Sequence, residues 1–185
     1  MNREKMESIL KGRDEEYIQD QRVWKDYIEC KRKLIGQMEP KCVDYCMISE
    51  ANWLMRNQAL SCEELGVQVR VGDICYIDFG QAYINEAGFQ HFGLILSVYQ
   101  KKAFVVPMTS NIHQYKTAYD PKSNEIGKRH LMKIGLIAGM NRPSVLFLND
   151  CKYINTARII DVKAHIVPTS LLFDTIKKRI QELVF

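Results

Sequence analysis

The stretch that most constrains the fold is residues 71–110, where three apolar runs follow one another with turn residues between them. The first run, residues 74–77, is β-branched and aromatic and follows a Gly-Asp turn, which is typical of a strand. The second run covers residues 92–98, and the third covers residues 103–107. Because only Gln-Lys-Lys separates the last two runs, the sequence predicts a tight antiparallel hairpin there.

The predicted hairpin brings one histidine close to two hydroxyl groups. His91 begins the second strand, and Thr109 and Ser110 end the third. In an antiparallel pair, the start of one strand lies beside the end of its neighbour. An imidazole beside two hydroxyls, with basic residues close by, is a candidate site for cutting RNA.

The N-terminal third of the chain is predicted to be helical. Residues 14–38 carry apolar side chains at spacings of three, four and seven, which indicates one amphipathic stripe. The Glu39-Pro40 pair ends this helix, because the residue before a proline avoids helical backbone angles. A second helix begins near Pro40, so we expect a helical hairpin. Its apolar side most simply covers the sheet, although it could also pair with a second copy or bind a partner.

The remaining elements complete an α+β fold. Residues 67–71 alternate between apolar and polar side chains, so they either lengthen the first strand or form their own. Residues 111–129 are predicted to be a long surface loop that contains one helical turn. Further strands are expected at residues 130–138, 144–153 and 158–167, and a final helix after 168–170. We predict a small, partly open antiparallel β-barrel with a C-terminal helix (66–185), preceded by a helical hairpin extension (1–65).

The positive charge is concentrated in the predicted barrel. The whole chain has a net charge of +4. Residues 1–65 hold 11 Lys and Arg against 13 Asp and Glu, whereas residues 66–185 hold 15 against 9. A basic barrel suits a polyanionic partner such as RNA.

The sequence predicts a cytoplasmic protein without a resident metal or cofactor. The first twenty residues are heavily charged, unlike a secretory signal, and no apolar run approaches the ~18 residues of a membrane helix. The six cysteines contain no CxxC pair, so we interpret them as reduced, partly buried thiols. A metal site at Cys30, Cys42, Cys46 and Cys62 is the alternative, but zinc sites use shorter ligand spacings.

Three segments carry a family resemblance. GDICYIDFG, GFQHFGLIL and VVPMTS resemble the MazF/PemK (Kid) toxins, and the later segment SVLFLNDCKYIN resembles a further strand of that family. The run HFGLIL…VVPMTSNIHQYK is also similar to the related ToxN/AbiQ toxins. The resemblance covers roughly residues 66–185 and implies a barrel of this type. It also implies metal-independent cleavage of single-stranded RNA to a 2′,3′-cyclic phosphate and a 5′-hydroxyl end.

The resemblance implies catalytic roles for His91, Thr109 and Ser110. Thr109 and Ser110 match the family's Thr-Ser pair, and their hydroxyls can hold a phosphate oxygen or orient the 2′-oxygen. His91 stands where MazF toxins have a catalytic arginine, and Phe92 stands where they have proline. A histidine can accept or donate a proton near neutral pH, but it lacks the fixed fork of an arginine.

The same resemblance indicates which residues contact RNA. Asn149 stands where MazF toxins have an acidic residue, and Asp150 follows it on what we expect to be the other face of a strand. Lys152 matches a family arginine. Basic and aromatic residues elsewhere could form a track for bases and phosphates, as they do in proteins that bind single strands. These residues are Tyr83, Phe89, Lys101, Lys102, His113, Tyr115 and Lys116.

Three functions remain open at this point. The first is the toxin of a toxin–antitoxin pair, a homodimeric endoribonuclease neutralised by a protein or RNA antitoxin. The second is a non-enzymatic inhibitor that binds a topoisomerase, because the CcdB toxins share this type of fold without cutting RNA. The third is an inactive interaction module, which His91, Asn149 and the helical extension would all fit.

Overall fold

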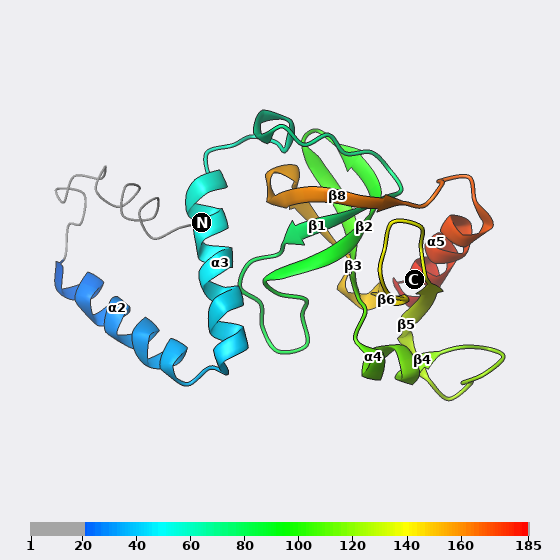
Figure 1. Ribbon diagram of the computed structural model, residues 1–185, viewed down its shortest axis with the longest axis horizontal. Coiled ribbons are helices and arrows are strands. Elements are labelled where there is room, and N and C mark those ends of the chain that lie inside the picture. The colour runs from blue at the N-terminus through cyan, green and yellow to red at the C-terminus, as the bar shows by residue number, and fades with distance from the viewer. Residues whose placement is uncertain (1–20, 185) are drawn as a thin grey trace.

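The computed structural model describes residues 21–184, which form an α+β fold around one mostly antiparallel sheet (Figure 1). The strand order is β4-β5-β6-β3-β2-β1-β8, and β7 pairs separately with β3. The sheet is open, because β4 and β8 end this order. Its strands are β1 (Asp73–Asp78), β2 (Gln90–Tyr99), β3 (Lys102–Thr109), β4 (Ala118–Tyr119), β5 (Lys128–Gly135), β6 (Ser144–Phe147), β7 (Lys152–Asn155) and β8 (Ile159–His165).

The helices lie at the ends of the molecule. Figure 1 places α5 at the opposite end from the α2–α3 pair, and α2 extends away from α3 rather than packing along it. The α-helices are α2 (Gln21–Gly36), α3 (Pro40–Arg56), α4 (Ile112–Thr117) and α5 (Leu171–Val184). Three short 3-10 turns are η2 (Glu63–Leu65), η3 (Leu148–Asp150) and η4 (Thr156–Arg158).

The predicted fold class and the three central strands are confirmed. β1, β2 and β3 pair as consecutive antiparallel neighbours. Gln100 and Lys101 have φ angles of 45° and 66°, as the two central residues of a type I′ hairpin turn require. The last helix also begins where Ser170 predicts it, since the Ser170 hydroxyl accepts a hydrogen bond from the Phe173 amide.

Three other predictions were wrong in detail. The strand expected at 144–153 is two strands, β6 and β7, because η3 interrupts it. Residues 67–71 form no strand, although Val67 and Val69 pack against the core. The loop expected at 111–129 contains the predicted helical segment, α4, but also the short strand β4, which pairs in parallel with β5.

The sheet separates two apolar layers. One layer contains Ile74 and Leu94 and is covered by the Phe173, Ile176 and Ile180 side chains of α5. The other layer contains alternate residues of the same strands, among them Cys75, Ile77, Ile95 and Val105, with Cys62. Because neighbouring residues of a strand face opposite sides, β1 is buried on both faces.

Polar side chains join α3 to the sheet. The buried carboxylate of Asp78 accepts hydrogen bonds from the Ser49 hydroxyl at 2.6 Å and the Asn52 amide at 2.7 Å. Gln90 donates to Asp78 and to the Tyr45 carbonyl, at 3.4 and 3.3 Å. This network places α3 directly beside Gln90, the residue before His91.

The apolar side of the helices does not cover the sheet, so that interpretation was wrong for the described residues. On α2, the Trp24, Tyr27 and Leu34 side chains are 47%, 51% and 59% exposed. On α3, the Met47 and Met55 side chains of the predicted apolar side are 41% and 45% exposed, although Ala51 is buried; Trp53 is 61% exposed. Residues 14–20, which begin the predicted stripe, lie outside the described residues. The outer surface of both helices is therefore open to solvent.

Candidate functional site

The hairpin of β2 and β3 places His91 opposite Thr109. Phe92 pairs with Met108, so continuing this register by one residue sets His91 against Thr109 at the ends of the two strands. The Cα atoms of such opposite residues lie about 4.5–5.5 Å apart, and their side chains share one face. This is the arrangement that the hairpin predicted.

A carbonyl of the β1–β2 loop fixes the His91 ring. His91 Nδ1 lies 2.6 Å from the Gly88 carbonyl oxygen. A carbonyl can only accept, so Nδ1 carries the proton and Nε2 holds the lone pair of the neutral ring. Nε2 is therefore the atom that can take a proton from a ligand.

Asp150 holds the adjacent residue of the same loop. Its Oδ2 accepts a hydrogen bond from the Ala87 amide at 2.6 Å, one residue before the carbonyl that His91 binds. Asp150 Oδ1 pairs with Lys152 Nζ at 2.7 Å. The sequence placed Asn149 and Asp150 on opposite faces of a strand. Both residues lie instead in η3, so this prediction was wrong. The loop thus brings His91, Asp150 and Lys152 into one neighbourhood.

An aromatic ring, that of Phe79, lies close to Lys152 and to Gly93. Lys152 Nζ lies 5.8 Å from the centroid of the Phe79 ring. A Cβ atom on Gly93 would lie 2.9 Å from Ile77 Cδ1 and 3.4 Å from Phe79 Cζ. A side chain at Gly93 would therefore press first on the terminal methyl group of Ile77, which lies on the same face of the sheet as His91.

The hydroxyl groups of Thr109 and Ser110 differ in their surroundings. Thr109 Oγ1 accepts a hydrogen bond from the Asn111 amide at 3.2 Å, so it also stabilises the turn after β3. Asn111 in turn caps α4 by accepting from the His113 and Gln114 amides. Ser110 is exposed between the strand and this cap.

Among the predicted RNA-binding residues, those on α4 lie next to the hydroxyl pair. His113 and Lys116 are exposed on this helix. Tyr115 packs instead against Ala118, Leu131 and Val145, and its ring lies 5.5 Å from Lys133 Nζ. The Tyr115 side chain therefore packs α4 against the sheet.

The other predicted RNA-binding residues are more scattered. Lys101 and Lys102 lie in the β2–β3 turn, at the far end of the hairpin from Thr109. Thr109 lies seven positions along β3 from Lys102, about 23 Å at 3.3 Å per residue. The structure does not bring these two lysines to His91, because the strands between them are extended.

The two loop residues predicted to stack on bases, Tyr83 and Phe89, differ in how exposed their side chains are. The Tyr83 side chain is 86% exposed at the tip of the β1–β2 loop. Phe89 is half-buried with a φ of 53°, an uncommon angle for a bulky residue, two positions before His91. Asn149 is exposed in η3. Tyr83 and Asn149 are thus accessible to a ligand, whereas Phe89 shapes the loop.

The cysteines belong mainly to the packing of the fold. Burial raises the pKa of the Cys75 thiol to about 12 and that of Cys151 to about 11. Cys62 is buried beside Cys75, whereas Cys30 is exposed on α2. Within residues 21–184, no group of three His, Cys, Asp or Glu side chains is arranged to hold a metal ion. In the same residues, no helix combines the length and apolar character needed to cross a bilayer.

Comparison with known proteins finds similarity in solved structures. No protein-family model and no curated protein matches the chain. MazF from Deinococcus radiodurans is similar with a TM-score of 0.47 and 14% identity, over 64% of this chain and 97% of that one. A MazE–MazF structure from the same organism gives 0.42 and 15%, over 63% and 95%. The Mycobacterium tuberculosis toxin MazF-mt6 gives 0.41 and 13%, over 60% and 93%. Because all three TM-scores are below 0.5, we infer no activity from this similarity.

Proposed function

We propose that this protein is an endoribonuclease that cuts single-stranded RNA without a metal ion, as the toxin of a toxin–antitoxin pair. The observation that carries the proposal is the bond from His91 Nδ1 to the Gly88 carbonyl, which leaves Nε2 as a proton acceptor. The motifs that resemble MazF/PemK and ToxN/AbiQ toxins support it. In this proposal, residues 66–185 form the catalytic body and residues 1–65 form an extension.

The reaction needs a base, a group that stabilises negative charge and a proton for the leaving oxygen. His91 Nε2 takes the proton of the 2′-hydroxyl as the 2′-oxygen bonds to phosphorus. The bond from phosphorus to the 5′-oxygen breaks, and this oxygen takes a proton from water. Thr109, Ser110 and Lys152 stabilise the charge that develops on the phosphate. The products are a 2′,3′-cyclic phosphate and a 5′-hydroxyl end.

RNA approaches along the exposed side chains around His91. Tyr83 offers a ring for stacking, and His113 and Lys116 lie on α4 beside the hydroxyl pair. Asn149 is accessible in η3, and Asp150 sets the position of the loop. An antitoxin, either protein or RNA, would block this surface, and the active form would be a homodimer in the cytoplasm.

Digestion of a labelled single-stranded RNA in EDTA tests the proposal. The purified protein should cut it, and His91→Ala should slow cutting by about 10²-fold or more, the usual contribution of a general base. Added imidazole should partly restore the activity of His91→Gly. Thr109→Ser should keep activity that Thr109→Ala loses. An inactive wild-type protein would remove the proposed function, and full activity of both alanine variants would remove the site.

A second candidate, a non-enzymatic interaction protein, is favoured by the exposed aromatic side chains of α2 and α3. Large apolar side chains gathered on one surface commonly mark a protein interface. A topoisomerase inhibitor of the CcdB type belongs to this class. A supercoiling assay beside the RNA digest separates the two functions, because inhibition without RNA cleavage supports the second candidate.

A further inference from the structure

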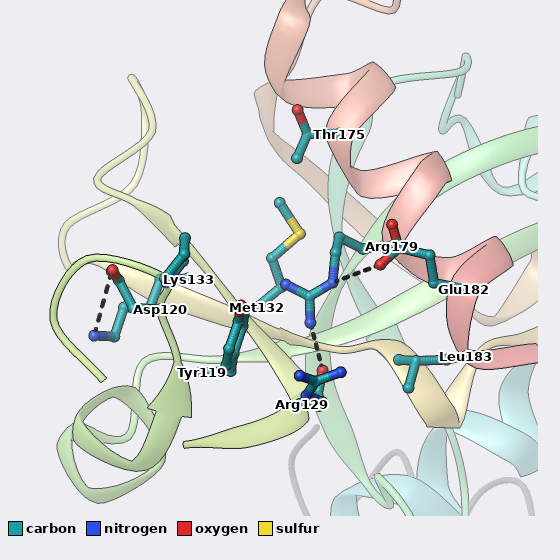
Figure 2. A pocket seen from close by; sticks show the side chains of 10 residues that line it. Tyr119, Asp120, Arg129, Met132, Lys133, Thr175, Arg179, Glu182 and Leu183 are labelled. Atoms are coloured by element: carbon teal, nitrogen blue, oxygen red, sulfur yellow. Dashed lines mark hydrogen bonds and ion pairs between the residues drawn. The ribbon is translucent and has the colours of Figure 1, made fainter. Parts of the chain in front are cut away.

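A separate cavity opens where the end of the sheet meets the C-terminal helix. It lies between β4, β5 and α5 and has a volume of about 440 Å³ (Figure 2). Small-molecule sites usually occupy about 300–1,000 Å³, so a ligand of nucleotide size fits. None of the residues that line it belongs to the His91 site.

Two guanidinium groups share one aromatic ring in this cavity. The Arg129 and Arg179 guanidinium carbons lie 5.4 and 5.0 Å from the centroid of the Tyr119 ring. Arg179 Nη2 also donates to the Arg129 carbonyl at 2.7 Å, which fixes the two residues relative to one another. Figure 2 shows both guanidinium groups beside the Tyr119 side chain.

The acidic groups of the cavity compensate only part of this positive charge. Glu182 lies 3.6 Å from Arg179 Nε, and Asp120 lies 3.7 Å from Lys133 Nζ. Hydrogen bonds from the Lys122 and Ser123 amides lower the pKa of the Asp120 carboxyl, so it is ionised near neutral pH. Within residues 21–184, Arg129 has no carboxylate partner. One cationic group therefore remains available to an anion.

Part of the cavity wall is apolar. Met132 and Leu183 line it beside the Tyr119 ring. A ligand that combines an anionic group with a flat apolar part uses both surfaces. A nucleotide has this composition, since its phosphate is anionic and its base presents an apolar face.

One residue of the cavity wall, Lys133, lies in the same row of the sheet as the hydroxyl pair. Thr109 pairs with Val145 on β6, and Val145 pairs with Lys133 on β5. Directly paired residues lie in one row across the strands, so about 10 Å separates the Cα atoms of Thr109 and Lys133. Lys133 also contacts Tyr115 of α4, the helix that begins just after Thr109 and Ser110.

We propose that the cavity binds a nucleotide of single-stranded RNA that flanks the one bound at His91. Arg129 and Arg179 hold its phosphate, and Tyr119, Met132 and Leu183 contact its base. This inference rests on the proposed function for the choice of RNA as the ligand. It adds a second contact surface to the substrate path, on the far side of α4.

Binding of a 2′-O-methyl oligouridylate, measured by fluorescence anisotropy, tests the site without cleavage. This probe lacks the 2′-hydroxyl nucleophile, so it reports binding even if the protein cuts no RNA. Arg129→Gln should weaken binding about fivefold to tenfold. It should also reduce the slope of the logarithm of the binding constant against the logarithm of the salt concentration by about 1, the value for one phosphate contact. The matched control Arg142→Gln, at an exposed arginine outside the cavity, should bind like wild type.

The outcomes separate the two proposals. If Arg129→Gln weakens binding but the wild-type protein cuts no RNA, the nucleotide site stands and the proposed activity falls. If the wild-type protein cuts RNA and Arg129→Gln binds like Arg142→Gln, the nucleotide site falls. Failure of the wild-type protein to bind the oligouridylate also overturns the site. Binding of an acidic peptide in its place would assign the cavity to a protein partner.

Discussion

Two helices meet the sheet in opposite ways. α5 packs Phe173, Ile176 and Ile180 into an apolar layer. α3 instead presents Ser49 and Asn52 to the buried carboxylate of Asp78. Apolar contacts depend on the area removed from water, whereas a buried polar network depends on every group keeping its partner. The fold therefore needs α5 for its core, whereas α3 is attached to a core that is already closed.

The largest effect is expected for a cavity in the α5 contact. Ile176→Ala removes a fully buried side chain and should lower the free energy of unfolding by about 3–4 kcal/mol. Urea unfolding measures this as a lower midpoint with an unchanged slope. Lys178→Ala, on the exposed side of the same helix, is the control and should change little. A small effect of Ile176→Ala would show that α5 is dispensable to the core.

A smaller and more local effect is expected at the α3 contact. Asp78→Ala leaves the Ser49 hydroxyl and the Asn52 amide without their acceptor and removes one of the two acceptors of the Gln90 amide, which should cost about 2–3 kcal/mol. Because α3 then keeps fewer bonds to the barrel, chiefly those from Arg56 to the Ala157 and Ile159 carbonyls, trypsin should cut the 21–56 region faster than the barrel. Asp161→Ala, at an exposed aspartate of β8, is the control. Equal protection of α3 in both variants would contradict a polar attachment.

The smallest effect is expected on the outer side of α3. Trp53→Gln should change the free energy of unfolding by no more than about 0.5 kcal/mol, because the side chain is mostly exposed. Thermal unfolding of the isolated protein measures this change. A loss comparable with that of Ile176→Ala would mean that Trp53 is buried in solution, for example against another copy of the chain.

The parts of the fold that the sequence predicted are those with a local signal. β-branched runs and a two-residue turn fix the β2–β3 hairpin, and with it the register that sets His91 against Thr109. β4 was missed because two residues carry no period that could identify a strand. The polar part of the inner side of α3 was missed because an apolar pattern locates buried residues such as Ala51, but it gives no sign that Ser49 is buried against Asp78.

The candidate site was predictable only in part, for a similar reason. The hairpin alone brings the histidine and the hydroxyls together. The Asp150 contact with Ala87 joins residues 63 positions apart, and no local pattern predicts it. The cavity at Tyr119 likewise depends on Arg179, which comes after strands β5 to β8 in the sequence. Contacts between residues so far apart in the sequence can be identified only from the folded structure.

Gly93 bears on how sequences of related chains should be interpreted. Its Cβ position is closed by Ile77 and Phe79, although it lies inside a strand and not in a turn. A larger residue at this position would therefore require the terminal methyl group of Ile77 to move. Invariance of this glycine across an alignment would reflect the space that Ile77 fills, rather than chemistry performed by the backbone.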